Sequence, residues 1–281
     1  MLRWTTYDLI FFDCDSTLST IEGVDELARL KGKQDRVGIL TQKAMDGDLD
    51  LADVYGKRLR AIKPTRAQLD TIERMYWDTM VPDTPAVIAA LHYLRRHVFI
   101  ISGGLADAVN GFGRRLGVAS DHIRAVSLQY NELSGEWWRY YDPAAQRNQS
   151  YLDYHEGPLT VSSGKSEVVR ELAGNHFGRR LLIGDGTSDL ATQNNSIDLF
   201  VGFGGVVVRP KVEAEADVFV YPKTLAPVLP LAAGYAGYMA LKGTPYASVF
   251  EKGLRICQSS AVKFATPELE TAFLQEFAHE E

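Results

Sequence analysis

The stretch that most constrains this chain covers residues 7–28 and reads YDLIFFDCDSTLSTIEGVDELA. Its apolar run at residues 9–12 predicts a short buried strand. Two carboxylates, Asp13 and Asp15, follow at the end of that strand, and the next residues predict a turn that leads into a helix. Ligands bind at the carboxyl ends of strands in open α/β sheets. The stretch therefore predicts two acids at a binding edge, although Asp is also common in caps and turns.

The composition is that of a globular protein with no strong preference for nucleic acid. The chain has 281 residues, of which 46% are hydrophobic and 23% charged, enough for one large domain or two small ones. Its 30 basic and 36 acidic residues give a net charge of -6. Nucleic acid is thus disfavoured as the main partner, while a local basic patch stays open.

Cysteine usage and hydropathy favour a cytoplasmic protein that does not enter a membrane. Cys14 and Cys257 are far apart in sequence, so no disulfide framework is expected. The amino-terminal residues lack the basic and apolar regions of a signal peptide. The most apolar tract, residues 225–241, contains two prolines and is too short to span a bilayer.

Residues 19–82 form a block with helical spacing and no strand-like alternation. Helices are predicted over residues 33–45, 49–62 and 65–76, with Pro64 as the break between the last two. We interpret the block as an insertion between the first strand and the rest of an α/β core.

After this block, helices and strands alternate. The predicted helices cover residues 84–95, 105–116 and 164–172, and the predicted strands cover residues 98–101, 181–183, 199–203 and 218–221. Such alternation is typical of a parallel, doubly wound sheet. Between these segments, residues 125–130 and 137–141 predict a hairpin, and residues 143–160 predict a polar surface loop.

Three predicted strands end in groups that can do chemistry. Asp13 with Asp15, Ser102, and Asp185 with Asp189 each follow a strand. The carboxyl ends of parallel strands lie along one edge, so these side chains should converge. Carboxylates from two strands suit a hard cation such as Mg²⁺.

Two further features favour an anionic ligand at this edge. Ser102, Gly103 and Gly104 open a helix with free N–H groups, and Lys165 adds a positive charge. Alone, the first would be an ordinary strand-to-helix turn, Lys165 a solvated residue and residues 184–189 a turn. Together, a carboxylate nucleophile, a cation and anion donors point to phosphoryl transfer.

These motifs resemble those of the haloacid dehalogenase-like phosphatase superfamily, and specifically the phosphoserine phosphatases, over residues 7–221. The resemblance implies that Asp13 is the nucleophile that becomes an aspartyl phosphate and that Asp15 is the general acid and base. The implied phosphate-binding residues are Ser102, Gly103 and Lys165. The implied Mg²⁺ ligands are Asp13, the main-chain carbonyl of Asp15, and Asp185, with Asp189 supporting the site.

Residues outside these motifs imply an amino-acid substrate, L-phosphoserine. Glu22 matches the acid that meets the substrate ammonium, and Arg58 matches the arginine that binds its carboxylate. Met45 and Ser188 complete the implied substrate contacts. Without the resemblance, Glu22 would be a helix N-terminal acid and Arg58 a solvated surface residue.

The chain departs from the family pattern at Asp46, at Leu51, at residues 105–106, and in the long loop at residues 143–160. These departures leave three alternatives to phosphoserine hydrolysis open. The chain could hydrolyse another small phosphorylated metabolite, transfer the phosphoryl group to an acceptor other than water, or bind a phospho-ligand without turnover.

The expected organisation is a Rossmann-like core at residues 1–18 and 83–222 with a small helical cap at residues 19–82. A mostly helical extension at residues 223–281 is expected to pack on the core or on a second subunit. A homodimer is therefore one of the open alternatives.

Overall fold

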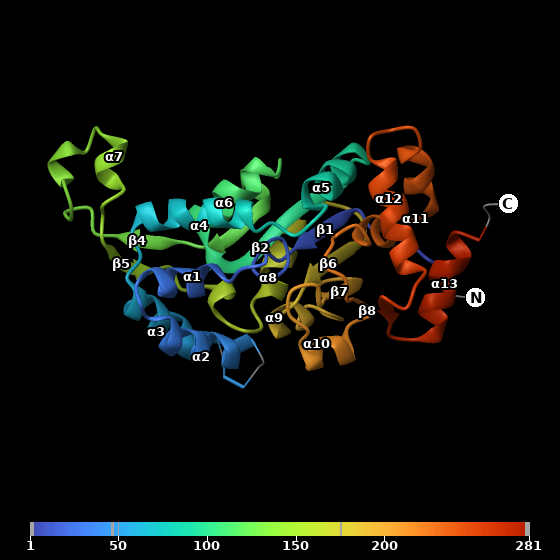
Figure 1. Cartoon of the computed structure of the whole chain (residues 1–281), viewed down its shortest axis with the longest axis horizontal. Helices are drawn as coiled ribbons and strands as arrows, with labels where there is room; N and C mark the ends of the chain where they lie inside the picture. Colours follow the sequence, from blue (N-terminus) through green and yellow to red (C-terminus); the bar gives the residue numbers. More distant parts are fainter. Residues whose placement is uncertain (1–2, 46–47, 50, 175, 279–281) are drawn as a thin grey trace.

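The structure of the chain is a computed structural model that describes residues 3–45, 48–49, 51–174 and 176–278 (Figure 1). A seven-stranded sheet in the order β3-β2-β1-β6-β7-β8-β9 lies at its centre. The strands are β1 (Leu9–Phe12), β2 (His97–Leu105), β3 (Ile123–Val126), β6 (Arg180–Gly184), β7 (Leu199–Phe203), β8 (Val218–Val220) and β9 (Val262–Phe264). All neighbours pair in parallel except β8 and β9, which are antiparallel. The predicted α/β class with a doubly wound, Rossmann-like sheet is confirmed.

Strand β1 is central because its four residues are all apolar and are all fully buried. It pairs with β2 on one side and β6 on the other, and the ring of Phe11 stacks on that of Phe99 at 4.7 Å. From β1 and β2 the chain proceeds outward to β3, whereas from β6 it proceeds outward in the opposite direction. The strand order therefore reverses between β1 and β6, which places the ligand crevice beyond their carboxyl ends.

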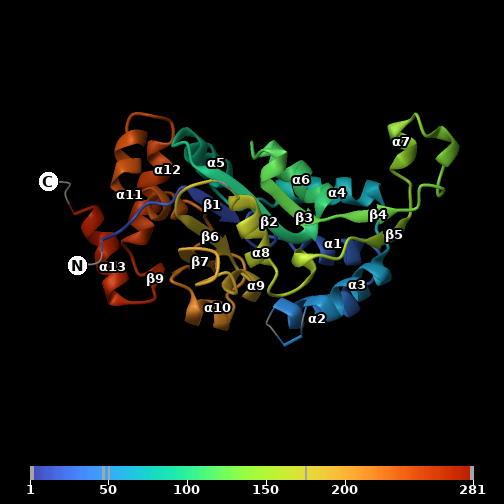
Figure 2. The ribbon, with the colours of Figure 1, turned by 180° about the vertical axis from the view of Figure 1, so that it is seen from behind.

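Helices cover both faces of the sheet. The core helices are α5 (Thr84–Tyr93), α6 (Ala106–Arg115), α8 (Lys165–Ala173), α9 (Thr187–Leu190) and α10 (Pro210–Glu215), with the 3₁₀ turn η1 (Ser120–His122) before β3. Figures 1 and 2 show α5 and α6 on one side of the sheet, and α9 and α10 on the other. This arrangement is the one that right-handed crossovers produce when the chain proceeds in opposite directions from a central strand.

The block after β1 is helical, as predicted. Its helices are α1 (Gly23–Leu30), α2 (Gln34–Met45), α3 (Leu51–Ile62) and α4 (Arg66–Asp78). Helix α4 begins with a capping box, in which the backbone N–H of Thr65 donates to Gln68 at 3.0 Å. The ring of Tyr76 in α4 lies 5.6 Å from that of Phe112 in α6, so the block packs directly on a core helix.

The hairpin prediction named the wrong partner. Strand β4 (Leu128–Tyr130) pairs with β5 (Tyr151–Tyr154), whereas residues 137–141 contain the 3₁₀ turn η2 (Trp137–Arg139). The side chain of Arg139 bonds both Glu136 and Asp142, which closes this segment on itself. Its aromatic residues remain exposed, so they provide no buried face for a strand. In Figure 1 the segment projects from one end of the molecule.

The prediction of an irregular surface loop over residues 143–160 is right about the surface for most of the segment but wrong about the irregularity. The segment contains α7 (Pro143–Gln146), the strand β5, and the 3₁₀ turn η3 (Pro158–Thr160). Asp142 caps α7 by accepting from the N–H of Ala144 at 2.8 Å. Leu159 and Thr160 are buried, so the end of the segment belongs to the interior.

The carboxyl-terminal part consists of α11 (Val228–Leu241), α12 (Ala247–Cys257), the strand β9 and α13 (Pro267–Glu276). It packs on the core. The indole N–H of Trp4 donates to Leu231 O at 3.1 Å, and its ring lies 5.0 Å from Phe273. Within the described ranges, no helix is long and apolar enough to cross a membrane.

Candidate active site

A tight turn after β1 directs Asp13 and Asp15 toward the crevice. The N–H of Asp13 still donates to Ile183 O at 2.9 Å, so Asp13 is held in register with β6. Cys14 O then accepts from Leu18 and Ser19, which reverses the chain. Asp13 and Asp15 are only 7% and 8% exposed. Burying two acids costs free energy unless they are paired or hydrogen-bonded, and their partners come from four other segments.

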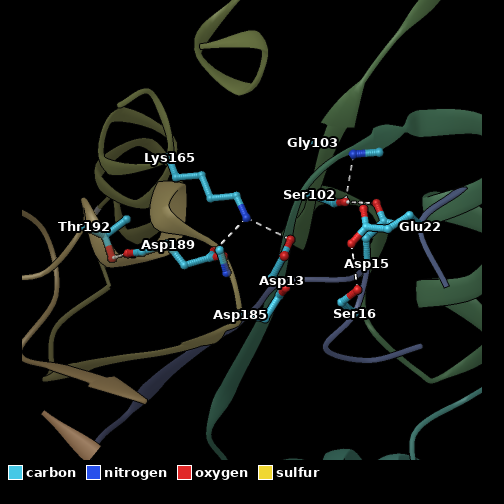
Figure 3. A network of polar contacts seen from close by, with 12 residues as sticks. Asp13, Asp15, Ser16, Glu22, Ser102, Gly103, Lys165, Asp185, Asp189 and Thr192 are labelled. Carbon is cyan, nitrogen blue, oxygen red and sulfur yellow. Dashed lines mark hydrogen bonds and ion pairs between the residues drawn. The ribbon is translucent and has the colours of Figure 1, made fainter. Parts of the chain in front are cut away.

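Lys165, the first residue of α8, bridges two of the acids (Figure 3). Its Nζ lies 2.8 Å from Asp13 Oδ1 and 2.6 Å from Asp189 Oδ1. Burial by itself lowers the pKa of Lys165, but the charges of Asp13 and Asp189 outweigh it and the net pKa is raised. Lys165 therefore stays charged and can hold an anion beside Asp13.

Three buried carboxylates form a cluster at the carboxyl ends of β1 and β6. Oxygens of Asp13, Asp185 and Asp189 lie within 4.8 Å of one another. Asp185 Oδ2 accepts from Arg209 Nε at 2.9 Å, and Asp189 Oδ2 accepts from the N–H of Gly186 at 3.1 Å.

The cluster carries more negative charge than its partners neutralise. Burial raises the pKa of Asp185 to about 6, despite Arg209. Burial and the charge of Asp13 raise the pKa of Asp189 to about 7, despite Lys165. A set of oxygen donors with this excess charge fits a hard divalent cation such as Mg²⁺.

Asp15 lies on the other side of Asp13 in a different environment. Its Oδ1 accepts from Tyr76 Oη at 2.7 Å and from the N–H of Gly23 at 2.8 Å. Burial nevertheless raises the pKa of Asp15 to about 6, because these two hydrogen bonds only partly offset it. A carboxyl group with this pKa can both donate and accept a proton near neutral pH.

Ser102 and Gly103 complete this wall. They lie within β2, near its carboxyl end, and not after the strand as the sequence predicted. The Ser102 hydroxyl is fully buried, donates to Asp15 Oδ2 at 3.5 Å and accepts from the N–H of Gly104 at 2.9 Å. Gly103 lines the pocket, and its carbonyl accepts from Tyr55 Oη at 2.7 Å. A hydrogen bond thus joins α3 to the core next to Asp15.

Glu22 lies at the start of α1 and is half-buried. Its Oε1 accepts from Ser16 Oγ at 2.7 Å and lies 4.0 Å from Arg209 Nη2. Burial and the charge of Asp15 raise the pKa of Glu22. A cationic ligand group beside Glu22 would favour its charged form.

Arg58 is buried inside the helical block rather than solvated. It is 3% exposed, its Nη1 donates to Thr41 Oγ1 at 3.0 Å, and Thr41 in turn donates to Asp25 Oδ1 at 2.5 Å. The guanidinium carbon lies 5.2 Å from the centre of the Tyr55 ring. Among the described residues, the buried Arg58 Nε has no hydrogen-bond partner. Such an orphaned donor on a pocket wall suits a carboxylate ligand.

Most of these groups face one pocket, whose empty volume of about 680 Å³ includes space open to solvent, whereas Asp185, Ser102 and Arg209 do not line it. Its lining residues are Asp13, Asp15, Glu22, Val24, Tyr55, Arg58, Gly103, Leu159, Val161, Ser162, Lys165, Gly186, Thr187, Ser188 and Asp189. The segment that the sequence predicted as a surface loop thus contributes Leu159 to the pocket wall.

The structure brings together most residues that the sequence singled out. Ser188 lines the pocket, whereas Ser102 lies behind its surface. The side chains of Met45 and Leu51 lie outside the described part of the chain, as does Asp46.

Sequence reasoning missed several functional partners. Tyr55 and Tyr76 bond Gly103 and Asp15 across more than forty residues, and nothing in the sequence distinguishes them from the other tyrosines. The contact of Arg209 with Asp185 was also not foreseen. Thr41 had a weak signal, since it lies four residues after Val37 in α2 and both side chains are buried.

An acid pair after the central strand, a lysine across from it and a carboxylate cluster at the switch point define a phosphoryl-transfer site on a Rossmann-like core. Comparisons with known proteins identify the family. Phosphoserine phosphatase of Mus musculus is 31% identical over 76% of this chain and 88% of that protein. The chloroplastic phosphoserine phosphatase of Arabidopsis thaliana is 28% identical over 78% of this chain and 70% of that protein.

Solved structures agree in fold. A structure described as a phospho-aspartyl intermediate analogue of phosphoserine phosphatase superposes with a TM-score of 0.66 at 23% identity, covering 80% of this chain and 98% of that one. No protein-family model matches the chain. The chain belongs to the phosphoserine phosphatase family of haloacid dehalogenase-like phosphatases.

Proposed function

We propose that this protein hydrolyses L-phosphoserine to L-serine and inorganic phosphate through an aspartyl-phosphate intermediate. The observation that carries the proposal is that Glu22 and Arg58 both line the pocket that holds Asp13. A zwitterionic amino acid needs an anion for its ammonium and a cation for its carboxylate, and this pocket offers both. The family membership supports the same substrate.

In the first step, a carboxylate oxygen of Asp13 attacks phosphorus and the bond from phosphorus to the serine oxygen breaks. Asp15, in its protonated form, gives its proton to that departing oxygen. Lys165 stays beside Asp13 and holds a phosphoryl oxygen as negative charge is redistributed. The phosphoryl group then rests on Asp13, and serine is free to leave.

In the second step, Asp15 acts as a base. It takes a proton from a water molecule, whose oxygen attacks phosphorus and displaces the Asp13 carboxylate. Its raised pKa suits both directions of proton transfer. Tyr76 and the N–H of Gly23 hold Asp15 in place throughout.

Mg²⁺ fits the carboxylate cluster. Asp13, Asp185 and the main-chain carbonyl of Asp15 would hold it, and Asp189 would support the site through Lys165 and Gly186. When bound, the cation supplies charge neutralisation for the phosphoryl group and orients it. The excess of buried carboxylates over their cationic partners supports this assignment.

The helical block acts as the cap over the substrate, with residues 19–82 as its extent. The hydrogen bond from Tyr55 Oη to Gly103 O closes it against the core and limits the entry of water.

We place the protein in the cytoplasm because both cysteines are free and buried. The proposed reaction needs neither nucleic acid nor a membrane as a partner. The protein could also form a homodimer, which size-exclusion chromatography with light scattering would detect.

A second candidate is the same chemistry on another small phosphorylated metabolite. The apolar wall formed by Leu159 and Val161 favours it, because L-phosphoserine has little apolar surface to place there. Phosphate release from a panel of phosphorylated metabolites, with and without Mg²⁺, tests both. We expect the highest kcat/KM with L-phosphoserine and no turnover without a divalent cation. A higher kcat/KM with an apolar phosphomonoester would favour the second candidate, and no release from any substrate would contradict both.

A further inference from the structure

Three of the six histidines converge at the amino-terminal edge of the sheet, opposite the candidate active site. His97 begins β2, His122 ends η1 just before β3, and His176 lies in the connection between α8 and β6. A ring nitrogen of each lies within 4.8 Å of the others. The residues come from three separate segments, so the fold, and not local sequence, brings them together.

The orientation of His122 favours a ligand. Its Nδ1 lies 3.0 Å from Val98 O. A carbonyl oxygen can only accept, so Nδ1 carries the proton and Nε2 has a free lone pair. A hydrogen bond to a backbone carbonyl on the outer nitrogen is the arrangement that commonly orients metal-binding histidines.

We propose that His97, His122 and His176 form a site for a divalent transition-metal ion, with Zn²⁺ as the reference ion. Imidazole nitrogens suit Zn²⁺, Co²⁺, Ni²⁺ and Cu²⁺, whereas Mg²⁺ prefers oxygen ligands. The site is therefore chemically different from the carboxylate cluster at the other edge. Three protein ligands leave a fourth position for water or a small anion.

The three ring nitrogens would have to move only slightly closer together to bind an ion. Tetrahedral Zn²⁺ with bonds of about 2.0–2.1 Å requires ligand nitrogens roughly 3.3 Å apart, which rotations of the side chains can provide. His176 is exposed and gives the ion a path from solvent, while His97 and His122 are half-buried. The rings of His97 and His176 lie 4.2 Å apart between centroids, so no other side chain separates them.

The surrounding charges leave the imidazoles available. Asp8 is occupied, since its carboxylate pairs with Arg96 and accepts from the N–H of Arg179. The bound ion would tie together the start of β2 and the chain segments that precede β3 and β6.

The test is metal binding by the full chain with Mg²⁺ at saturation, so that the carboxylate cluster is occupied. After treatment with a chelator and return to Mg²⁺, isothermal titration with ZnCl₂ should show one site per chain and a rise in Tm. His97→Gln and His176→Gln should each weaken Zn²⁺ binding by more than about 100-fold, since even loss of an outer-shell partner costs 10–100-fold. His176 is exposed, so its variant is expected to fold normally.

Two controls separate this site from others. His155→Gln changes an exposed histidine outside the cluster and should bind Zn²⁺ as wild type. Asp185→Asn alters the carboxylate cluster and should also retain the site. Equal Zn²⁺ affinity in wild type and His176→Gln, loss of binding only in Asp185→Asn, or no Zn²⁺ binding by wild type would each overturn the proposal.

Discussion

The two edges of the sheet are built from the same strands but offer opposite chemistry. At the carboxyl ends of β1 and β6, Asp13, Asp185 and Asp189 are all buried and are held by a lysine and an arginine. At the amino ends, His97 and His176 lie at or near the surface, and Asp8 is already paired.

The difference shows how burial determines what a charged group can do. Strands β1 and β6 have only four and five residues, so the two edges are close together and border the same hydrophobic core. Acids at the carboxyl edge have raised pKa values because protein covers them, whereas solvent reaches the groups at the amino edge. We therefore expect substitutions at the first edge to change turnover and those at the second to leave it intact.

The largest expected effect compares the two ends of β1. Asp13→Asn should lower kcat by roughly 10⁴-fold or more, because it removes the nucleophile. Asp8→Asn, its matched control, should keep kcat/KM within about twofold and cost about 0–1 kcal/mol of stability, since its ion pair with Arg96 is partly exposed. Phosphate release and thermal unfolding measure both. Near-normal turnover of Asp13→Asn would exclude the covalent mechanism.

The next effect concerns Asp15. Asp15→Asn cannot transfer a proton, so we expect a loss of about 10²–10⁴-fold in kcat. An aryl phosphate with a good leaving group should recover formation of the intermediate, which then accumulates because its hydrolysis still needs the base. Rapid-quench detection of phosphoenzyme checks this. If the good leaving group restored the full steady-state rate, a base other than Asp15 would be at work.

A smaller, substrate-dependent effect is expected at the pocket walls. Arg58→Ala should lower kcat/KM for phosphoserine by roughly 10–150-fold, the worth of hydrogen bonds to a charged group, and change it little for a simple aryl phosphate. Arg58→Lys should recover only part, since an ammonium lacks the bidentate fork. Glu22→Gln should behave like Arg58→Ala. The exposed Arg60 on the same helix provides the control Arg60→Ala. Equal losses on both substrates would indicate a structural role.

The smallest effect tests closure of the cap on the core. Tyr55→Phe removes the hydrogen bond to Gly103 O but keeps the ring beside Arg58, so kcat/KM should fall by about 2–10-fold. Tyr154→Phe is the control, because among the described residues its hydroxyl donates only to Glu156, at 3.4 Å. Steady-state kinetics on phosphoserine measure both. A Tyr55→Phe enzyme indistinguishable from the control would mean that this bond does not hold the cap closed.

Strand ends could be predicted from the sequence because the signal is local. The run at residues 9–12 followed by Asp13, and the run at residues 181–183 followed by Asp185, each identify a strand and its functional end. Since a parallel sheet places such strand ends along one edge, the carboxylate cluster could be predicted as well. Lys165 alone would be interpreted as a solvated residue, and only its combination with the strand-end groups singled it out. Glu22 and Arg58 required the family resemblance.

The features that could not be predicted depend on tertiary contacts, which no local sequence pattern encodes. Strand β9 has only three residues and forms by pairing with β8. Residues 137–141 are rich in aromatic residues, as many strands are, but these side chains stay exposed, and β4 pairs with β5 instead. Arg58 is buried because Thr41 and Tyr55 surround it, which spacing within one helix cannot reveal.

The contact between Trp4 and the last helices has a consequence for how the chain folds. Trp4 precedes the central strand, but its ring packs on Phe264 and Phe273, more than 250 residues later. The entropy of closing so long a loop must be overcome before this contact is made. During synthesis, the region around Trp4 therefore stays incomplete until residues up to Phe273 have left the ribosome, and its apolar surface is exposed for most of that time.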